Sequence, residues 1–147
     1  MIEKKPMSVG KAFLDTNIFV YLYSETEIYK RARISSVINA YHRVISMQVL
    51  KEFCNVCIHK MKLPVPFIKD AVEEICETCE LLEVNYLTVV KALDVHEKYW
   101  YAYYDSLIIA SALEHDCLYL LTEDMSNGQV IEGRLTIKNI FTMEMLD

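Results

Sequence analysis

Short apolar segments that alternate with longer amphipathic ones constrain the fold of this chain more than any other feature of its sequence. The first, at residues 12–14, stops abruptly at a carboxylate, Asp15. Such short runs, separated by stretches with apolar residues at every third or fourth position, are typical of buried strands alternating with helices. They predict an α/β fold in which a short parallel sheet carries helices on both faces. The predicted strands are residues 12–14, 44–46, 83–86, 118–121 and 135–137.

The helical spacing of apolar residues places a helix in almost every connection between these strands. The segment 107–113 is apolar almost all round, so we expect that helix to be buried. Thr88 is expected to cap the helix that follows it. The predicted helices are residues 18–23, 28–42, 47–61, 67–82, 89–98 and 107–113.

The length and composition of the chain limit the kind of protein it is. Its 147 residues, 53% of them hydrophobic, suffice for one continuous core, so we expect a single domain over residues 1–147. No apolar run is long enough to span a bilayer and no secretory segment is seen, so we expect a cytoplasmic protein outside the membrane. The net charge of −6 argues against nucleic-acid binding through bulk positive charge. A nucleic-acid ligand would need metal ions or a local basic patch.

Four carboxylates are expected to meet at one edge of the sheet. Asp15 follows the first predicted strand and Asp124 follows the fourth. Glu52 lies in the first turns of the helix after the second strand, and Asp105 precedes the buried helix. In open parallel sheets the ligand crevice lies beyond the carboxyl ends of the strands, which is where all four acids fall. Taken singly, these acids also suit helix caps, a turn or a solvated helix face, and it is their joint placement that favours a shared cleft.

The chemistry of clustered carboxylates points to divalent cations. Acids packed together repel one another, and some have raised pKa values, unless a cation neutralises them. Ligands that are all oxygen suit Mg²⁺ or Mn²⁺ better than zinc. A site of this kind hydrolyses phosphodiesters, because a metal ion generates a nucleophile from water near neutral pH and also stabilises the leaving oxygen.

The residues around these acids resemble a known family. Four blocks in order carry the resemblance, and it runs nearly end to end. They are Asp-Thr-Asn at 15–17, the segment 46–52 that ends at Glu52, the segment 104–110 around Asp105, and the segment 121–125 around Asp124, which Gly-Gln-Val-Ile follows at 128–131. In these blocks the chain is similar to the PIN domain and, within it, to the VapC-type toxins of bacterial toxin–antitoxin pairs.

The resemblance implies a three-layer α/β/α sandwich and a Mg²⁺- or Mn²⁺-dependent endoribonuclease that is the toxin of a type II toxin–antitoxin pair. It implies that Asp15, Glu52, Asp105 and Asp124 bind the metals and are catalytic. It further implies that Asn17 and Thr122 are small polar residues that support water or substrate phosphate. The partners that it implies are an RNA substrate, a second copy of the chain in a homodimer, and a small protein antitoxin whose tail plugs the active-site groove.

Three other interpretations stay open at this point. The same fold also serves PIN nucleases of RNA processing or of single-stranded DNA outside toxin–antitoxin systems. A non-catalytic α/β binding module, whose acids only cap helices, is the alternative from a different functional class. Two Cys-x-x-Cys pairs, Cys54 with Cys57 and Cys76 with Cys79, are spaced for a structural zinc site. All four cysteines fall on apolar helical positions, however, which favours packing in the core.

Overall fold

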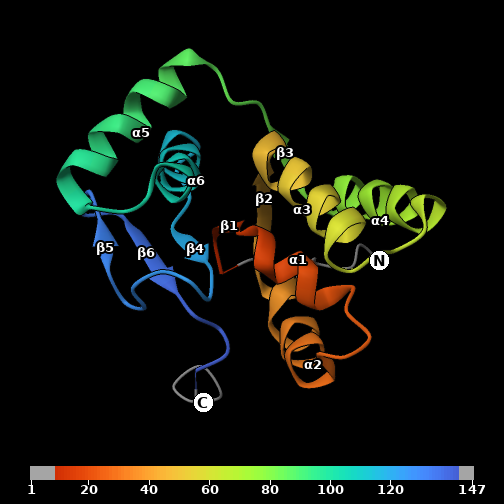
Figure 1. Cartoon of the computed structure of the whole chain (residues 1–147). Coiled ribbons are helices and arrows are strands. Elements are labelled where there is room, and N and C mark those ends of the chain that lie inside the picture. The colour runs from red at the N-terminus through yellow and green to blue at the C-terminus, as the bar shows by residue number, and fades with distance from the viewer. Residues whose placement is uncertain (1–8, 143–147) are drawn as a thin grey trace, which may run out of the picture.

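A computed structural model describes residues 9–142, and a six-stranded sheet runs through its centre (Figure 1). Neighbouring strands are parallel except for the pair β5 and β6. The central strands β1 and β4 are buried, since helices flank the sheet. Listed as they lie side by side, the strands are β3 Glu80–Leu82, β2 His42–Ser46, β1 Lys11–Leu14, β4 Tyr119–Leu121, β6 Leu135–Lys138 and β5 Val130–Ile131.

The helices lie in two groups, with α5 packed along α6, and α1 packed against α2 and α3 (Figure 1). Helix α6 is buried from Ser106 to Leu113, as its apolar sequence predicts. The expected α/β fold is therefore confirmed, although its sheet is mostly rather than entirely parallel. Within residues 9–142, no helix has the length and apolar character needed to cross a membrane. The α-helices are α1 Thr16–Leu22, α2 Ile28–Val37, α3 Met47–His59, α4 Val65–Thr78, α5 Tyr86–Tyr99 and α6 Tyr103–Glu114.

Two predicted helices end more than one helical turn earlier than expected, because a strand follows soon after each. The helix predicted at 28–42 ends at Val37 and passes through the 3₁₀ turn Ile38–Ala40 before β2 begins. The helix predicted at 67–82 ends at Thr78, and the strand predicted at 83–86 is wrong, since β3 is Glu80–Leu82. Apolar residues continue across both junctions, so hydrophobic spacing alone does not mark where helix becomes strand.

Two smaller expectations also need correction. The N-cap of α5 is Asn85, while Thr88 closes a capping box with it from the third helical position and donates to Glu114 on α6 over 2.8 Å. Strand β5 was not predicted, because its two residues, Val130–Ile131, are too few to show a pattern. It pairs antiparallel with β6 at the edge of the sheet.

The two Cys-x-x-Cys pairs are free thiols on α3 and at the end of α4. Cys57 and Cys79 are buried in the core and Cys54 packs against it, whereas Cys76 is exposed, so its predicted place in the core is wrong. In the part of the chain that the structure describes, no three His, Cys, Asp or Glu side chains are arranged to hold a metal ion as they stand. The structural zinc site gains no support.

Candidate active site

Asp15 lies at the centre of the sheet, where β1 ends and α1 begins. Its backbone N–H donates to the carbonyl of Leu121 in β4 over 3.0 Å. Side-chain Oδ1 accepts from the N–H of Thr16 at 2.7 Å and caps α1, and Oδ2 accepts from the hydroxyl of Thr122 at 2.8 Å. Asp15 is only 6% exposed. It is therefore a helix cap, but a buried one whose second oxygen is fixed from the neighbouring strand.

Helix α3 brings Glu52 to the same edge of the sheet. Its Oε2 accepts from the hydroxyl of Thr16 at 2.6 Å, and its Oε1 accepts from the side-chain amide of Gln48 at 2.8 Å. The same amide of Gln48 donates to the carbonyl of Tyr104 at the start of α6 over 3.1 Å. Glu52 is thus fixed by hydrogen bonds from side chains of α1 and α3. The interpretation of Glu52 as a solvated surface glutamate is therefore wrong.

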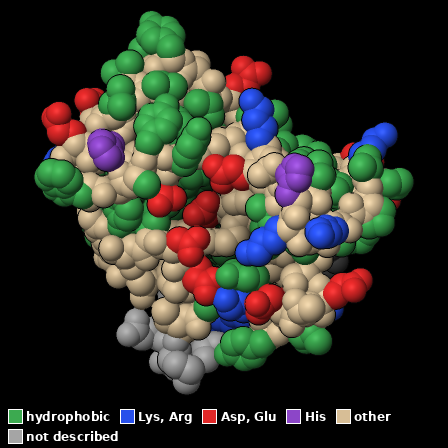
Figure 2. All heavy atoms as spheres, in the orientation of Figure 1, with side chains coloured by type: hydrophobic (Ala, Val, Ile, Leu, Met, Phe, Trp, Pro, Cys, Tyr) green, Lys and Arg blue, Asp and Glu red, His purple; other side chains and the backbone are tan. Residues whose placement is uncertain are grey.

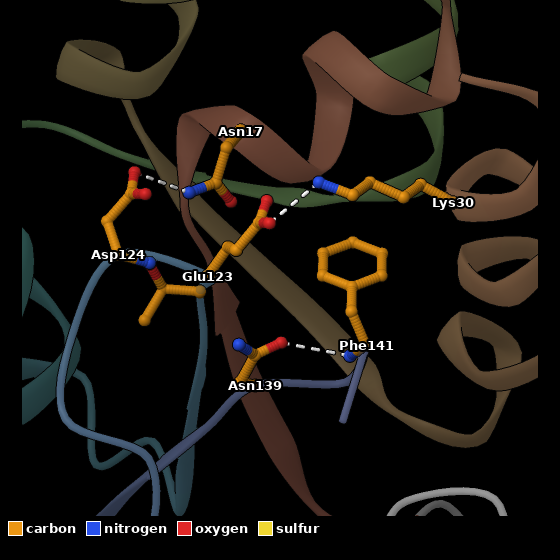
Figure 3. A network of polar contacts seen from close by, with 7 residues as sticks. Asn17, Lys30, Glu123, Asp124, Asn139 and Phe141 are labelled. Atoms are coloured by element: carbon orange, nitrogen blue, oxygen red, sulfur yellow. Dashed lines mark hydrogen bonds and ion pairs between the residues drawn. The ribbon is translucent and has the colours of Figure 1, made fainter. Parts of the chain in front are cut away.

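Asp105 and Asp124 complete the group of acids. Asp105 lies in the first turn of α6, but the N-cap of that helix is Ala102, so Asp105 does not cap it. Asp124 follows β4, and its Oδ2 accepts from the side-chain amide of Asn17 at 2.9 Å, a contact drawn in Figure 3. The N–H of Asp124 donates to the hydroxyl oxygen of Thr122 over 3.2 Å. Thr122 therefore links the backbone of Asp124 to the carboxylate of Asp15.

The acids are close enough to affect one another's ionisation. Burial, with smaller contributions from the charges of Asp105 and Glu52, raises the pKa of Asp15 to about 6, although hydrogen bonds from Thr122 and Thr16 act to lower it. Burial, followed by the charges of Asp124 and Glu52, also raises the pKa of Asp105. Acidic side chains gather along a hollow in the middle of the face shown in Figure 2. The four acids predicted from the sequence form one negatively charged cluster.

This cluster fits a hard divalent cation in its chemistry. Each candidate ligand is an oxygen, and a cation would stabilise the ionised acids that burial and mutual repulsion disfavour. Asn17 Oδ1 is buried and has no hydrogen-bond partner among the described residues, so it is free to accept a hydrogen bond from water or to coordinate a cation. The four acids are not a ready-made ligand cage. Mg²⁺ does not need one, since it keeps several waters and takes one or two carboxylates.

Thr16 and Gln48 are the two supporting residues that were not singled out from the sequence. Each fixes one oxygen of Glu52. A signal for both was present: Gln48 precedes Glu52 by one helical turn, and Thr16 directly follows Asp15. The sequence does not show, however, that Thr16 donates a hydrogen bond to Glu52, because this contact exists only when α1 and α3 pack side by side.

The sequence matches the family model described as PIN domain over residues 12–126, a range that contains all four acids. No curated protein sequence matches the chain. Several solved structures share its fold. One is a toxin–antitoxin complex from Klebsiella pneumoniae, with a TM-score of 0.68 and 19% identity over 90% of this chain and 100% of that chain.

Two further structures are similar at low identity. VapBC2 from Rickettsia felis, bound to a DNA fragment from its promoter, has a TM-score of 0.62 and 17% identity over 87% of this chain and 98% of that chain. The Sarcin-Ricin loop cleaving toxin VapC20 of Mycobacterium tuberculosis has a TM-score of 0.60 and 12% identity over 75% of this chain and 87% of that chain. At such identities the likeness shows the fold alone. Since the family model spans most of the sequence and the fold agrees with it, the chain belongs to the PIN domain family.

Proposed function

We propose that this protein is a Mg²⁺- or Mn²⁺-dependent endoribonuclease and the toxin of a type II toxin–antitoxin pair. The observation that carries the proposal is the gathering of Asp15, Glu52, Asp105 and Asp124 at the carboxyl edge of the sheet of a PIN domain. Nucleases of this family usually depend on a divalent metal. A group of four acids that includes the buried Asp15, with a partly unpartnered amide beside it, is a site that a cation would stabilise.

In this proposal the four acids hold the metal, and their neighbours fix them in place. Thr122 orients Asp15, while Thr16 and Gln48 hold the two oxygens of Glu52. Asn17 holds one oxygen of Asp124 through its amide nitrogen and leaves Oδ1 free to accept a hydrogen bond from a water molecule. A bound divalent cation supplies activated water near neutral pH and stabilises charge on the leaving oxygen.

The proposed substrate and antitoxin are carried over from proteins with the same fold. One similar structure is a Sarcin-Ricin loop cleaving toxin, and another is a toxin–antitoxin complex. The chain has a net charge of −6, so RNA would have to be drawn to the acid cluster through the metal rather than through bulk charge. The antitoxin would cover the same groove and keep RNA out.

A homodimer is part of the proposal, and helix α5 offers a surface for it. Its exposed side carries large apolar residues one and two turns apart, which is unusual for a helix in water. A second copy of the chain would cover this side. The exposed apolar residues of α5 are Tyr86, Leu87, Val90 and Leu93.

The test is metal-dependent cleavage of a panel of structured and single-stranded RNAs by the purified protein. Cleavage is expected with millimolar Mg²⁺ or Mn²⁺ and not with EDTA. Asp105→Asn should abolish it while thermal unfolding shows an intact fold. Asp70→Asn, which removes an exposed acid on α4, is the matched control and should cut as the wild type does.

Two outcomes would contradict the proposal. Full cleavage by a folded Asp105→Asn variant would remove the acid cluster from the chemistry. No cleavage of any RNA with either metal, together with cleavage of single-stranded DNA, would favour the alternative of a PIN nuclease outside toxin–antitoxin systems.

A further inference from the structure

We infer that Lys30 is a positioning residue for Asp124 and acts through Glu123, the residue directly before it. This inference rests on the proposed function, since it concerns how the metal site is held. Lys30 reaches from α2 to the loop after β4, where its Nζ lies 2.6 Å from Oε1 of Glu123 (Figure 3). The pair joins residues that are 93 positions apart in the sequence.

The ammonium group of Lys30 is held by three separate parts of the chain. It lies 4.1 Å from the ring centre of Tyr21 in α1 and 5.4 Å from that of Phe141 after β6. These two rings pack edge to face at 5.5 Å, and the N–H of Phe141 donates to the side chain of Asn139 over 2.9 Å. Aromatic faces attract a cation, so Lys30 is fixed more firmly than a lysine in an exposed ion pair.

Glu123 depends on this lysine for its charge compensation. The side chains of the pair are only 25% and 26% exposed. The second oxygen of Glu123, Oε2, is buried and makes no hydrogen bond of normal geometry among the described residues, and the side chain of Tyr21 is the other polar neighbour of this carboxylate. Without Lys30, a partly buried carboxylate would lose its cation, and the stable response is for the side chain to turn toward water.

Movement of Glu123 would be passed on to the proposed metal site. Asp124 is the next residue, and its contacts with Asn17 and Thr122 require the present path of the loop. Residues that orient metal ligands in this way typically change metal affinity by about 10- to 100-fold when they are replaced. Lys30 therefore contributes to metal binding although it belongs to α2 and has no place in the acid cluster.

The sign of the effect separates positioning from simple electrostatics. Lys30 is a positive charge near the acid cluster, so its removal alone would make the site more negative and tighten Mn²⁺ binding. Loss of positioning has the opposite effect and weakens Mn²⁺ binding. The direction of the change in affinity therefore identifies which of the two effects dominates.

The experiment measures Mn²⁺ binding without RNA, by following the electron paramagnetic resonance signal of free Mn²⁺ during titration. Lys30→Met, which keeps the apolar stem, should weaken binding at the acid site about 10-fold. Lys30→Arg should restore most of the affinity, because it keeps the charge and the contact with Glu123. Lys30→Gln replaces Lys30→Met if the latter does not fold. In a Glu123→Gln background, Lys30→Met should have little further effect, since the two act as a unit.

The matched control is Lys98→Met. Lys98 also pairs with a glutamate, at 3.2 Å from Glu132, and lies 5.4 Å from the ring of Tyr99, but on the exposed side of α5. This control should bind Mn²⁺ as the wild type does. Equal or tighter binding by a folded Lys30→Met variant would overturn the inference and leave the proposed function standing. Absence of Mn²⁺ binding by the wild type would overturn both.

Discussion

Replacement of Asp15 by asparagine should stabilise the metal-free protein at alkaline pH although it removes a central residue of the site. Asp15 is buried, and burial is the main reason that its pKa rises from 3.8 to about 6. Each tenfold change in proton affinity corresponds to about 1.4 kcal/mol, so ionised Asp15 opposes folding by about 3 kcal/mol. Asparagine is never charged and keeps the oxygen that caps α1 through Thr16.

The sign of the pH dependence follows from the raised pKa. A carboxyl group with a raised pKa in the folded state contributes most to stability below its unfolded value, 3.8, and loses that contribution as the pH rises through about 6. The wild type should therefore lose stability relative to Asp15→Asn between about pH 4 and pH 7. The altered hydrogen bond with Thr122 offsets part of the gain, by about 1 kcal/mol.

Thermal unfolding in EDTA at pH 4.5 and pH 8 measures this effect. With about 2 kcal/mol of net stabilisation, Asp15→Asn should melt roughly 4 to 8 °C above the wild type at pH 8, and the gap should narrow at pH 4.5. Addition of Mn²⁺ should raise the melting temperature of the wild type only. Melting temperatures of the two proteins that change in parallel with pH, or a less stable variant at pH 8, would refute burial of an ionised carboxylate at this position.

Three further predictions concern the fold. Hydrogen bonds with two histidines lower the pKa of Glu80, so its contribution to stability is present at neutral pH and is lost as the pH falls below the ordinary glutamate range. In urea unfolding, Glu80→Gln should lower the free energy of unfolding by less than about 1 kcal/mol at pH 7, and by a smaller amount at pH 3. Phe53→Ala removes a fully buried ring and should cost about 3 to 5 kcal/mol in the same assay; a loss below about 1 kcal/mol would contradict the packing. Thr88→Val breaks the capping box of α5 and should cost about 1 to 2 kcal/mol, whereas an unchanged urea midpoint would show that the box contributes nothing.

The parts of the fold that the sequence predicts are those with a strong hydrophobic period. Strand β1 and helices α3 and α6 lie where apolar spacing places them, because their buried faces determine their packing. Strands β3 and β5 were misplaced or missed, since they are edge strands of only three and two residues, too short to show a hydrophobic period. Backbone pairing with a neighbour defines such strands, and the sequence does not display that pairing.

The candidate site was also predictable only in part. The positions of Asp15 and Asp124 follow from the rule that ligand sites lie beyond the ends of parallel strands. The contacts that hold the acids do not follow from it. Thr16 reaches Glu52 across 36 residues, and Lys30 reaches Glu123 across 93. The packing of helices on the sheet determines which of these side chains meet, and no local sequence pattern predicts it.

Anomalous scattering from Mn²⁺, recorded on crystals of the protein soaked with the metal, would locate the metal ion directly. An anomalous peak is expected within ligand distance of carboxylate oxygens from the group Asp15, Glu52, Asp105 and Asp124, and it should be lost in Asp105→Asn crystals. A well-ordered acid cluster with no Mn²⁺ beside it, or a peak only at other carboxylates, would contradict the claim that these four residues form a divalent metal site.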